Sequence, residues 1–213
     1  MYALKLRPPL QQHLAASPAV LADVLDDSVN LTVWQRELSP QVSAFAQQLL
    51  LAEPQLALAF TCEADGEGLL TPLGDAIPGA QLPGYAEFCA DLDWLMNAFV
   101  CLLGAQRIGM RLRSLASPMC PRWHVDHVPL RLISTYSGPA SQWLLEGAMD
   151  RRQLGSAAHE PQDPSAAQHL QAGWVALAKG EKWQGNEGAG LIHRSPAVPD
   201  GARRLLLTMD WLA

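Results

Sequence analysis

The sequence has none of the features that mark a membrane-embedded, exported or repetitive protein. The longest apolar run, at 92–103, is too short to span a bilayer and begins beside Asp91 and Asp93. Residues 1–10 contain two basic side chains but no apolar segment of the kind found in a signal peptide. No internal repeat and no low-complexity tract is present. We therefore expect a globular, cytoplasmic protein without a membrane partner.

Basic charge and paired cysteines are also scarce. The 213 residues include 15 Lys and Arg against 21 Asp and Glu, a net charge of -6. A general nucleic-acid binder normally carries a basic stripe, so duplex nucleic acid is an unlikely partner. No Cys-x-x-Cys pair and no disulfide framework is evident, which favours reduced thiols. The cysteines are Cys62, Cys89, Cys101 and Cys120.

The sequence does contain enough apolar residues, 49%, to build one sizeable core. We predict a single domain over residues 1–213, in which residues 1–104 form a mainly helical support region. Ser17-Pro18 and Ser39-Pro40 each read as a helix N-cap followed by proline at the first helical position. A third helix is expected to start near Tyr85, and a strand is expected at 57–62.

Residues 105–213 have a different sequence pattern, with short strand-like segments separated by turns. The expected strands are 108–115, 123–136, 142–146, 173–178, 190–193 and 203–211. A loop with a helical turn is expected at 151–169. This order predicts an α+β fold with a double-stranded β-helix, a jelly-roll or cupin-like barrel, braced by the N-terminal helices. Exposed edges of such barrels often pair, so a homodimer is one expected assembly.

The motif with the clearest chemistry is His124-Val125-Asp126, followed much later by His193. Side chains alternate along a strand, so His124 and Asp126 are expected on one face, with Val125 and His127 on the other. Two histidines and one carboxylate, with other positions open, form the facial triad of non-heme Fe(II) oxygenases. The sequence therefore predicts a metal site at His124, Asp126 and His193.

Two other interpretations of the same residues stay open. Cys120 stands four residues before His124 and would complete a closed four-ligand zinc site, as expected of a non-catalytic, zinc-handling protein. His127 is also nearby, although a regular strand turns it away. Alternatively, the barrel binds no metal and serves only in protein interaction.

From about residue 108 onward the chain resembles the 2-oxoglutarate/Fe(II)-dependent oxygenase superfamily. The matching residues are His124-Val-Asp126, His193 and the strand that begins at Arg203-Arg204 and continues to Thr208. Over its whole length the chain also resembles an uncharacterised bacterial family of unknown function. The superfamily resemblance implies an oxidoreductase, a hydroxylase-type dioxygenase with Fe(II) and 2-oxoglutarate as cofactors.

The resemblance further implies that an arginine on the last strand grips the distal carboxylate of 2-oxoglutarate. Alternation places Arg204 on one face with Thr208, whose hydroxyl would help, so we favour Arg204 over Arg203. Tyr136 is a further candidate co-substrate contact. Arg111 and Arg113 share one face of their strand, where they would hold an anionic substrate or lie in solvent. The sequence indicates no particular small-molecule or side-chain substrate.

Overall fold

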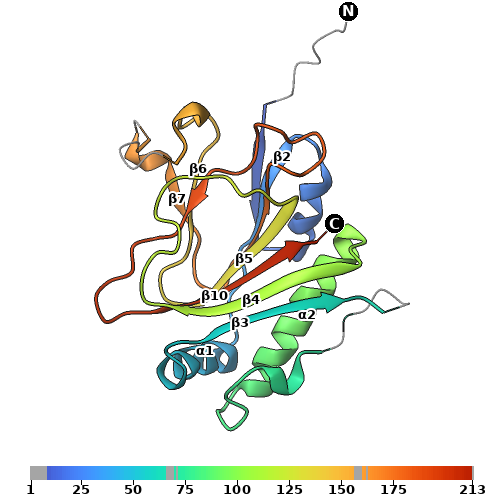
Figure 1. Ribbon diagram of the computed structural model, residues 1–213, viewed down its shortest axis with the longest axis vertical. Coiled ribbons are helices and arrows are strands. Elements are labelled where there is room, and N and C mark those ends of the chain that lie inside the picture. The colour runs from blue at the N-terminus through green and yellow to red at the C-terminus, as the bar shows by residue number, and fades with distance from the viewer. Residues whose placement is uncertain (1–8, 66–69, 71, 156–159, 162, 213) are drawn as a thin grey trace, which may run out of the picture.

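The computed structural model describes residues 9–65, 70, 72–155, 160–161 and 163–212, and its elements are arranged as Figure 1 shows. A seven-stranded sheet, in the order β1-β2-β8-β5-β10-β4-β3, is joined by a three-stranded sheet in the order β7-β6-β9. The strands are β1 (Gln11–Ala15), β2 (Val29–Trp34), β3 (Ala57–Glu63), β4 (Arg107–Leu115), β5 (Leu130–Ser137), β6 (Gln142–Leu144), β7 (Ala167–His169), β8 (Val175–Lys179), β9 (His193–Arg194) and β10 (Arg204–Trp211).

The predicted α+β class is confirmed, but the described strands do not form a closed barrel. The large sheet is open, with β1 and β3 at its edges. Its strand pairs are antiparallel except β1 with β2, which run parallel. The region before residue 105, expected to be mainly helical with one strand at 57–62, contains three strands of this sheet. β3 lies at the expected strand and pairs with β4, whereas β1 and β2 were not expected; they pair with each other, and β2 also pairs with β8.

The helices begin where the sequence predicts. Ser17 accepts a hydrogen bond from the Ala19 amide at the start of the 3-10 helix η1 (Pro18–Leu25), and Ser39 accepts one from the Val42 amide at the start of α1 (Pro40–Ala52). The third helix, α2, spans Tyr85–Leu103. Three further 3-10 turns are η2 (Gly74–Ala76), η3 (Arg151–Gln153) and η4 (Pro164–Ala166). No helix in the described part of the chain is long and apolar enough to cross a bilayer.

The large sheet has a core on each face. Leu205, Leu207 and Met209 of β10 pack on the side of α1 and α2, which Figure 1 shows below the sheet. Leu206, between them in sequence, points the other way and packs with Trp143 of the small sheet. This alternation follows from the two-residue period of a strand. The face of the large sheet that carries Leu206 is the one turned toward the small sheet, and the residues of the His124-Val125-Asp126 motif lie on that side.

Tyr136 belongs to the helix side and not to the space between the sheets. Its buried hydroxyl donates to Asp91 Oδ2 at 2.5 Å, and its ring lies 4.7 Å from that of Phe88. Arg36 completes the cluster with two hydrogen bonds to the Asp91 carboxylate, at 2.5 and 2.9 Å. Tyr136 therefore ties α2 to the sheet, and the expectation that it contacts a co-substrate is not supported.

Two predicted strands are shorter than expected, and both carry motif residues. The segment expected at 123–136 becomes regular only at Leu130, and the one expected at 190–193 is extended only at His193–Arg194. Proline at position 129 has no amide hydrogen to donate, which fits its place just before β5. The expected loop at 151–169 lies partly outside the described residues. His124 and Asp126 are thus held on irregular backbone, whereas His193 lies on the short strand β9.

Candidate metal centre and adjoining cavity

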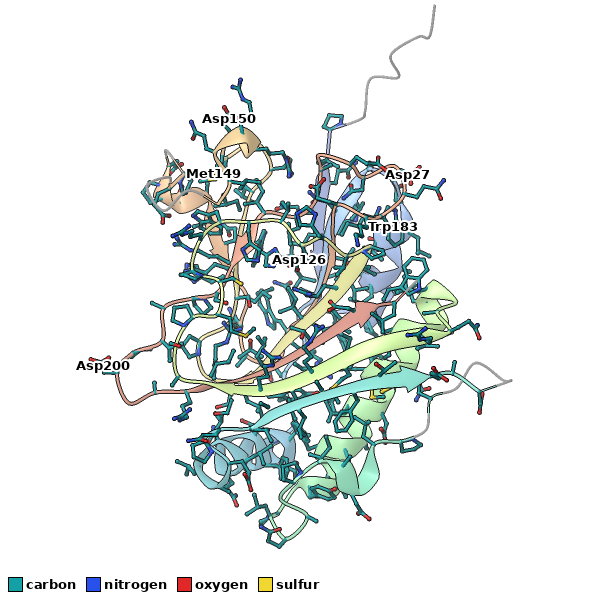
Figure 2. The ribbon with its side chains drawn as sticks, in the orientation of Figure 1. Asp27, Asp126, Met149, Asp150, Trp183 and Asp200 are labelled. Carbon is teal, nitrogen blue, oxygen red and sulfur yellow. The ribbon has the colours of Figure 1, made fainter. Side chains whose placement is uncertain are left out.

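His124, Asp126 and His193 come together between the two sheets, and Figure 2 shows Asp126 in this central position. Each offers one ligand atom, and these atoms all lie within 4.8 Å of one another. His193 Nε2 is 3.3 Å from Asp126 Oδ2, and His124 Nε2 is 3.8 Å from Asp126 Oδ1. The structure therefore brings together the three residues that the sequence singles out.

Backbone pairing explains why the two histidines meet. The His124 amide donates to the His193 carbonyl at 3.1 Å, and the His193 amide donates to the His124 carbonyl at 3.0 Å. Residues that exchange both bonds lie directly opposite each other in an antiparallel bridge, with their side chains on the same face. The two imidazole rings are accordingly 4.5 Å apart between centroids.

Asp126 is held in place by a close backbone contact with Gly180. The Glu181 amide donates to the Asp126 carbonyl at 2.9 Å. A Cβ added at Gly180 would lie 2.6 Å from the Asp126 carbonyl oxygen and 2.1 Å from that of Val128. Only glycine permits this approach, so the glycine-rich stretch before His193 serves the site by close packing.

The hydrogen bonds of both imidazoles leave one nitrogen of each ring available. Nδ1 of His124 bonds the Arg122 carbonyl at 2.9 Å, and Nδ1 of His193 bonds the Leu191 carbonyl at 3.1 Å. A carbonyl only accepts, so each Nδ1 carries a proton, and Nε2 is the atom of each ring that offers a lone pair to a metal when the ring is neutral. This backbone support is typical of metal-binding histidines. The arrangement fits a metal held through both Nε2 atoms.

The charge states of these residues also suit a cation. Burial, with a contribution from His193, lowers the pKa of His124, so the ring is neutral at neutral pH. Burial on its own raises the pKa of Asp126, but His193 and the charge of Arg131 outweigh it and hold that pKa well below its ordinary value. Neutral imidazole and ionised carboxylate are the forms that bind metal.

Arg131 is a site residue that the sequence analysis missed. Its Nη1 lies 2.8 Å from Asp126 Oδ2, while its Nε and Nη2 donate to the buried Asp210 at 2.6 and 3.0 Å. Arg111 pairs with the same Asp210 at 2.5 Å. Arg131 thus orients the carboxylate of Asp126 from a fixed position on β5. The alternation of side chains along a strand does not predict that Arg131 lies beside Asp126, because residues 127–129 are not a regular strand.

We expect Arg131→Met to weaken metal binding about 10- to 100-fold, the range seen when a group that orients a ligand is removed. The physical reason is that Asp126 loses the charge that fixes its rotamer. Fe(II) and Zn(II) affinity can be measured by competition with a chelating dye. Arg107→Met is the matched control, since Arg107 is an exposed arginine of β4 next to Glu63. Unchanged metal affinity in Arg131→Met would contradict the role.

A cavity of about 250 Å³ opens beside the three ligands, between β4, β10 and the small sheet. His124 and His193 line one part of it, and Leu206 and Thr208 of β10 line another. Arginines 111, 113, 131 and 194 also line its wall. The volume is near the lower end of the ~300–1,000 Å³ common for small-molecule pockets. The cavity therefore suits small, negatively charged molecules.

Arg204 is fully buried and adjoins the cavity through Ser141. Its Nη2 donates to Thr135 Oγ1 at 3.1 Å and to Ser141 Oγ at 3.0 Å, and Ser141 lines the cavity. Its Nε and Nη1 are buried without a hydrogen-bond partner in the described residues. Burial lowers the pKa of Arg204 to about 10, so it is still charged at neutral pH. A buried cation with two free donors fits an anion that binds there.

Arg203 is placed quite differently. Its Nη1 donates to the Pro54 carbonyl at 2.5 Å, on the outside of the molecule. Thr208 lines the cavity, on the same face of β10 as Arg204 and Leu206. A register shift against β5 falls between Leu205 and Leu206, but the pairing of β10 with β4 is continuous, so the faces are not exchanged. Of the two arginines, Arg204 is the one that adjoins the cavity, through its hydrogen bond to the lining residue Ser141.

Cys120 and His127 do not join the three ligands. Cys120 is exposed and lines the cavity, but the residues whose ligand atoms cluster within 4.8 Å, among those described, are His124, Asp126 and His193. His127 is exposed, on backbone that is not a regular strand. Two nitrogens and one carboxylate leave other coordination positions open. A closed zinc site with Cys120 would require the loop that carries it to move.

The chain belongs to the family described as "Protein of unknown function (DUF1826)", whose profile matches residues 15–210. This agrees with the whole-chain resemblance seen in the sequence. A search of curated proteins finds no match.

Solved structures show a similar fold. The crystal structure of a rice dioxygenase for auxin oxidation has a TM-score of 0.52 at 16% identity, covering 91% of this chain and 76% of that one. A Pseudomonas putida prolyl-4-hydroxylase has a TM-score of 0.49 at 14% identity, covering 91% and 96%. A Neurospora crassa protein, crystallised at full length with alpha-KG and 5-formyluracil, has 0.47 at 10%, covering 91% and 77%. The likeness to the rice dioxygenase concerns the fold, and it agrees with the superfamily resemblance.

Proposed function

We propose that this protein is an Fe(II)- and 2-oxoglutarate-dependent dioxygenase of the hydroxylase type. The proposal rests on two features found together. The His124, Asp126 and His193 cluster lies beside a cavity, and the cavity residue Ser141 contacts the buried Arg204, two of whose nitrogens have no partner among the described residues. A metal cluster alone would fit many proteins. An anion site beside it matches a reaction that needs a dicarboxylate. The two sheets then correspond to an open double-stranded β-helix.

The metal site would be formed by His124 Nε2, His193 Nε2 and a carboxylate oxygen of Asp126. These residues face one side of the metal position, so co-substrate has room on the other. When bound, iron and 2-oxoglutarate would supply the oxidising chemistry, with O2 consumed, succinate and CO2 released and a substrate C–H bond hydroxylated. Arg131 keeps the Asp126 carboxylate oriented toward the metal throughout.

The distal carboxylate of 2-oxoglutarate would bind Arg204. A guanidinium binds a carboxylate through charge-assisted N–H···O hydrogen bonds. Nη1 of Arg204 has no partner among the described residues and would donate to the carboxylate, while Nη2 is already held by Thr135 and Ser141 and the Nε–H bond lies on the side away from Nη1. The hydroxyl of Thr208, further along the same face of β10, would add a further donor. The hydroxyls of Thr135 and Ser141 hold the guanidinium of Arg204 in place before the anion binds.

Anaerobic addition of Fe(II) and then 2-oxoglutarate to the metal-free protein tests this function. We expect a weak visible charge-transfer band that saturates with 2-oxoglutarate. Succinate should give no band, because it lacks the keto group. In air, succinate and CO2 should form from 2-oxoglutarate. The absence of both the band and the products would overturn the proposal.

Metal analysis of the same preparation distinguishes the zinc-handling alternative from the proposed oxygenase. Its supporting observation is that Cys120 lines the cavity next to the histidines. A closed zinc site predicts tight zinc in the purified protein, weakened when Cys120→Ala removes the thiolate. The oxygenase predicts a 2-oxoglutarate band that is unaffected by Cys120→Ala.

A further inference from the structure

Arg113 differs from the other arginines of the cavity wall because no carboxylate of the described residues pairs with it. Arg111 and Arg131 are held by Asp210, and Arg131 also by Asp126. Arg194 pairs with Glu160 at 2.6 Å. Arg113, by contrast, makes no ion pair with any described residue. Its Nε is buried without a hydrogen-bond partner, and its Nη1 has only the weak contact with Met119 Sδ at 4.0 Å.

The strand register places Arg113 over the same space as the proposed co-substrate, but in a separate position. Arg113 of β4 lies opposite Leu206 of β10, on the face that looks toward the small sheet. Arg204 is fully buried and is fixed by two hydroxyls, whereas Arg113 is half-buried and its terminal nitrogens have no such support. The two guanidiniums are therefore suited to different ligands, Arg204 to a deep one and Arg113 to one nearer the opening.

The surroundings of Arg113 indicate what that second ligand contains. Met119, Ile133 and Leu206 also line the cavity, so apolar surface adjoins the charged nitrogens. Met119 is itself 48% exposed, and its flexible side chain can adapt to different shapes. A molecule with an apolar body and an oxyanion at one end satisfies both kinds of contact.

We infer that the substrate of this protein is a small organic anion, whose carboxylate or phosphate oxygens pair with Arg113 while its apolar part packs on Met119 and Leu206. The inference rests on the proposed dioxygenase function and adds the substrate class to it. The cavity volume, about 250 Å³, sets the size of the group that enters. Carboxylate and phosphate share the chemistry that a free guanidinium recognises.

The test uses three probes of similar size: phenylacetate, phenyl phosphate and the neutral phenylacetamide. Calorimetric titration of each into the metal-loaded protein with saturating 2-oxoglutarate, without oxygen, gives a Kd that does not depend on turnover. We expect at least one anion to bind more tightly than the amide. Arg113→Met should weaken that anion about tenfold or more, the effect of losing hydrogen bonds to a charged group. Arg113→Lys should restore part of the affinity.

Two controls keep the result specific to Arg113. Arg107→Met changes an exposed arginine of the same strand and should leave anion binding unchanged. The 2-oxoglutarate band should persist in Arg113→Met, which also shows that the variant is folded.

Three outcomes would overturn the inference. The first is that neither anion binds more tightly than the amide. The second is that Arg113→Met binds the anions as tightly as the wild type does. The third is that the anions compete with 2-oxoglutarate. In the last case Arg113 would belong to the co-substrate site. If the wild type shows no 2-oxoglutarate band, the proposed function fails. Anion binding that depends on Arg113 would still support the anion site.

Discussion

Replacing His193 by alanine is expected to abolish Fe(II) binding and with it all 2-oxoglutarate turnover. His193 would supply one of the three proposed protein ligands, and its imidazole is buried opposite His124; the cluster within 4.8 Å contains no fourth described ligand to replace it. With two ligands left, the affinity for Fe(II) should fall by at least about 100-fold, beyond the loss from an orienting group. Dye competition and the anaerobic charge-transfer band measure the two effects.

His127→Ala is the matched control for this prediction. His127 follows Asp126 directly in sequence, but its side chain is exposed and is not in the ligand cluster. The control should keep wild-type metal affinity and the full band. Retention of Fe(II) by His193→Ala, or its loss in His127→Ala, would show that the metal binds elsewhere.

Replacing Arg204 by methionine is expected to raise the KM for 2-oxoglutarate by about 100-fold or more while leaving the protein folded. The loss corresponds to two charge-assisted hydrogen bonds, each of about 1.5–3 kcal/mol. Removing an unpaired buried charge also relieves a desolvation cost, so stability should change little even though Thr135 and Ser141 lose a donor. Succinate release gives the KM, and chemical denaturation gives the stability.

The combination of these two readouts separates an anion site from a structural arginine. A structural Arg204 predicts a large loss of stability and no specific change in the KM for 2-oxoglutarate. Arg203→Met is the control, because Arg203 is the neighbouring residue but faces outward to Pro54. Ligand stabilisation adds a third readout: 2-oxoglutarate with metal should raise the Tm of the wild type and of Arg203→Met, but not that of Arg204→Met.

Local features of the fold could be predicted because they depend on neighbouring residues. Ser17-Pro18 and Ser39-Pro40 fix helix starts through a side-chain cap and a proline ring, both within one turn of chain. β3, β4 and β10 occur where the two-residue alternation predicts them. The segments at β1 and β2 were missed because their strands are stabilised by pairing with each other and with β8, which lies far away in sequence.

The three residues that cluster as candidate ligands could be predicted from the sequence, but the backbone that holds them could not. His124 and Asp126 were expected on a regular strand, whereas the structure holds them on irregular backbone, through the bridge to His193 and the close contact with Gly180. The same irregularity hid Arg131, because face alternation cannot be carried across residues that are not in a strand. Tyr136 lies on β5 at its register shift against β10, and its side chain points to the helix side.

The sequence by itself determined the inventory of this protein: the helix starts, the faces of the long strands, and two histidines and an aspartate in a facial-triad pattern. These features depend on the spacing of residues along the chain, because the backbone geometry of a helix or strand fixes the direction in which each side chain points. Only the tertiary structure decided that His124 meets His193, that Arg131 secures Asp126, and that Arg113 and Arg204 lack carboxylate partners among the described residues. Such contacts arise from hydrogen-bond pairing between distant segments, and local spacing carries no information about which segments pair.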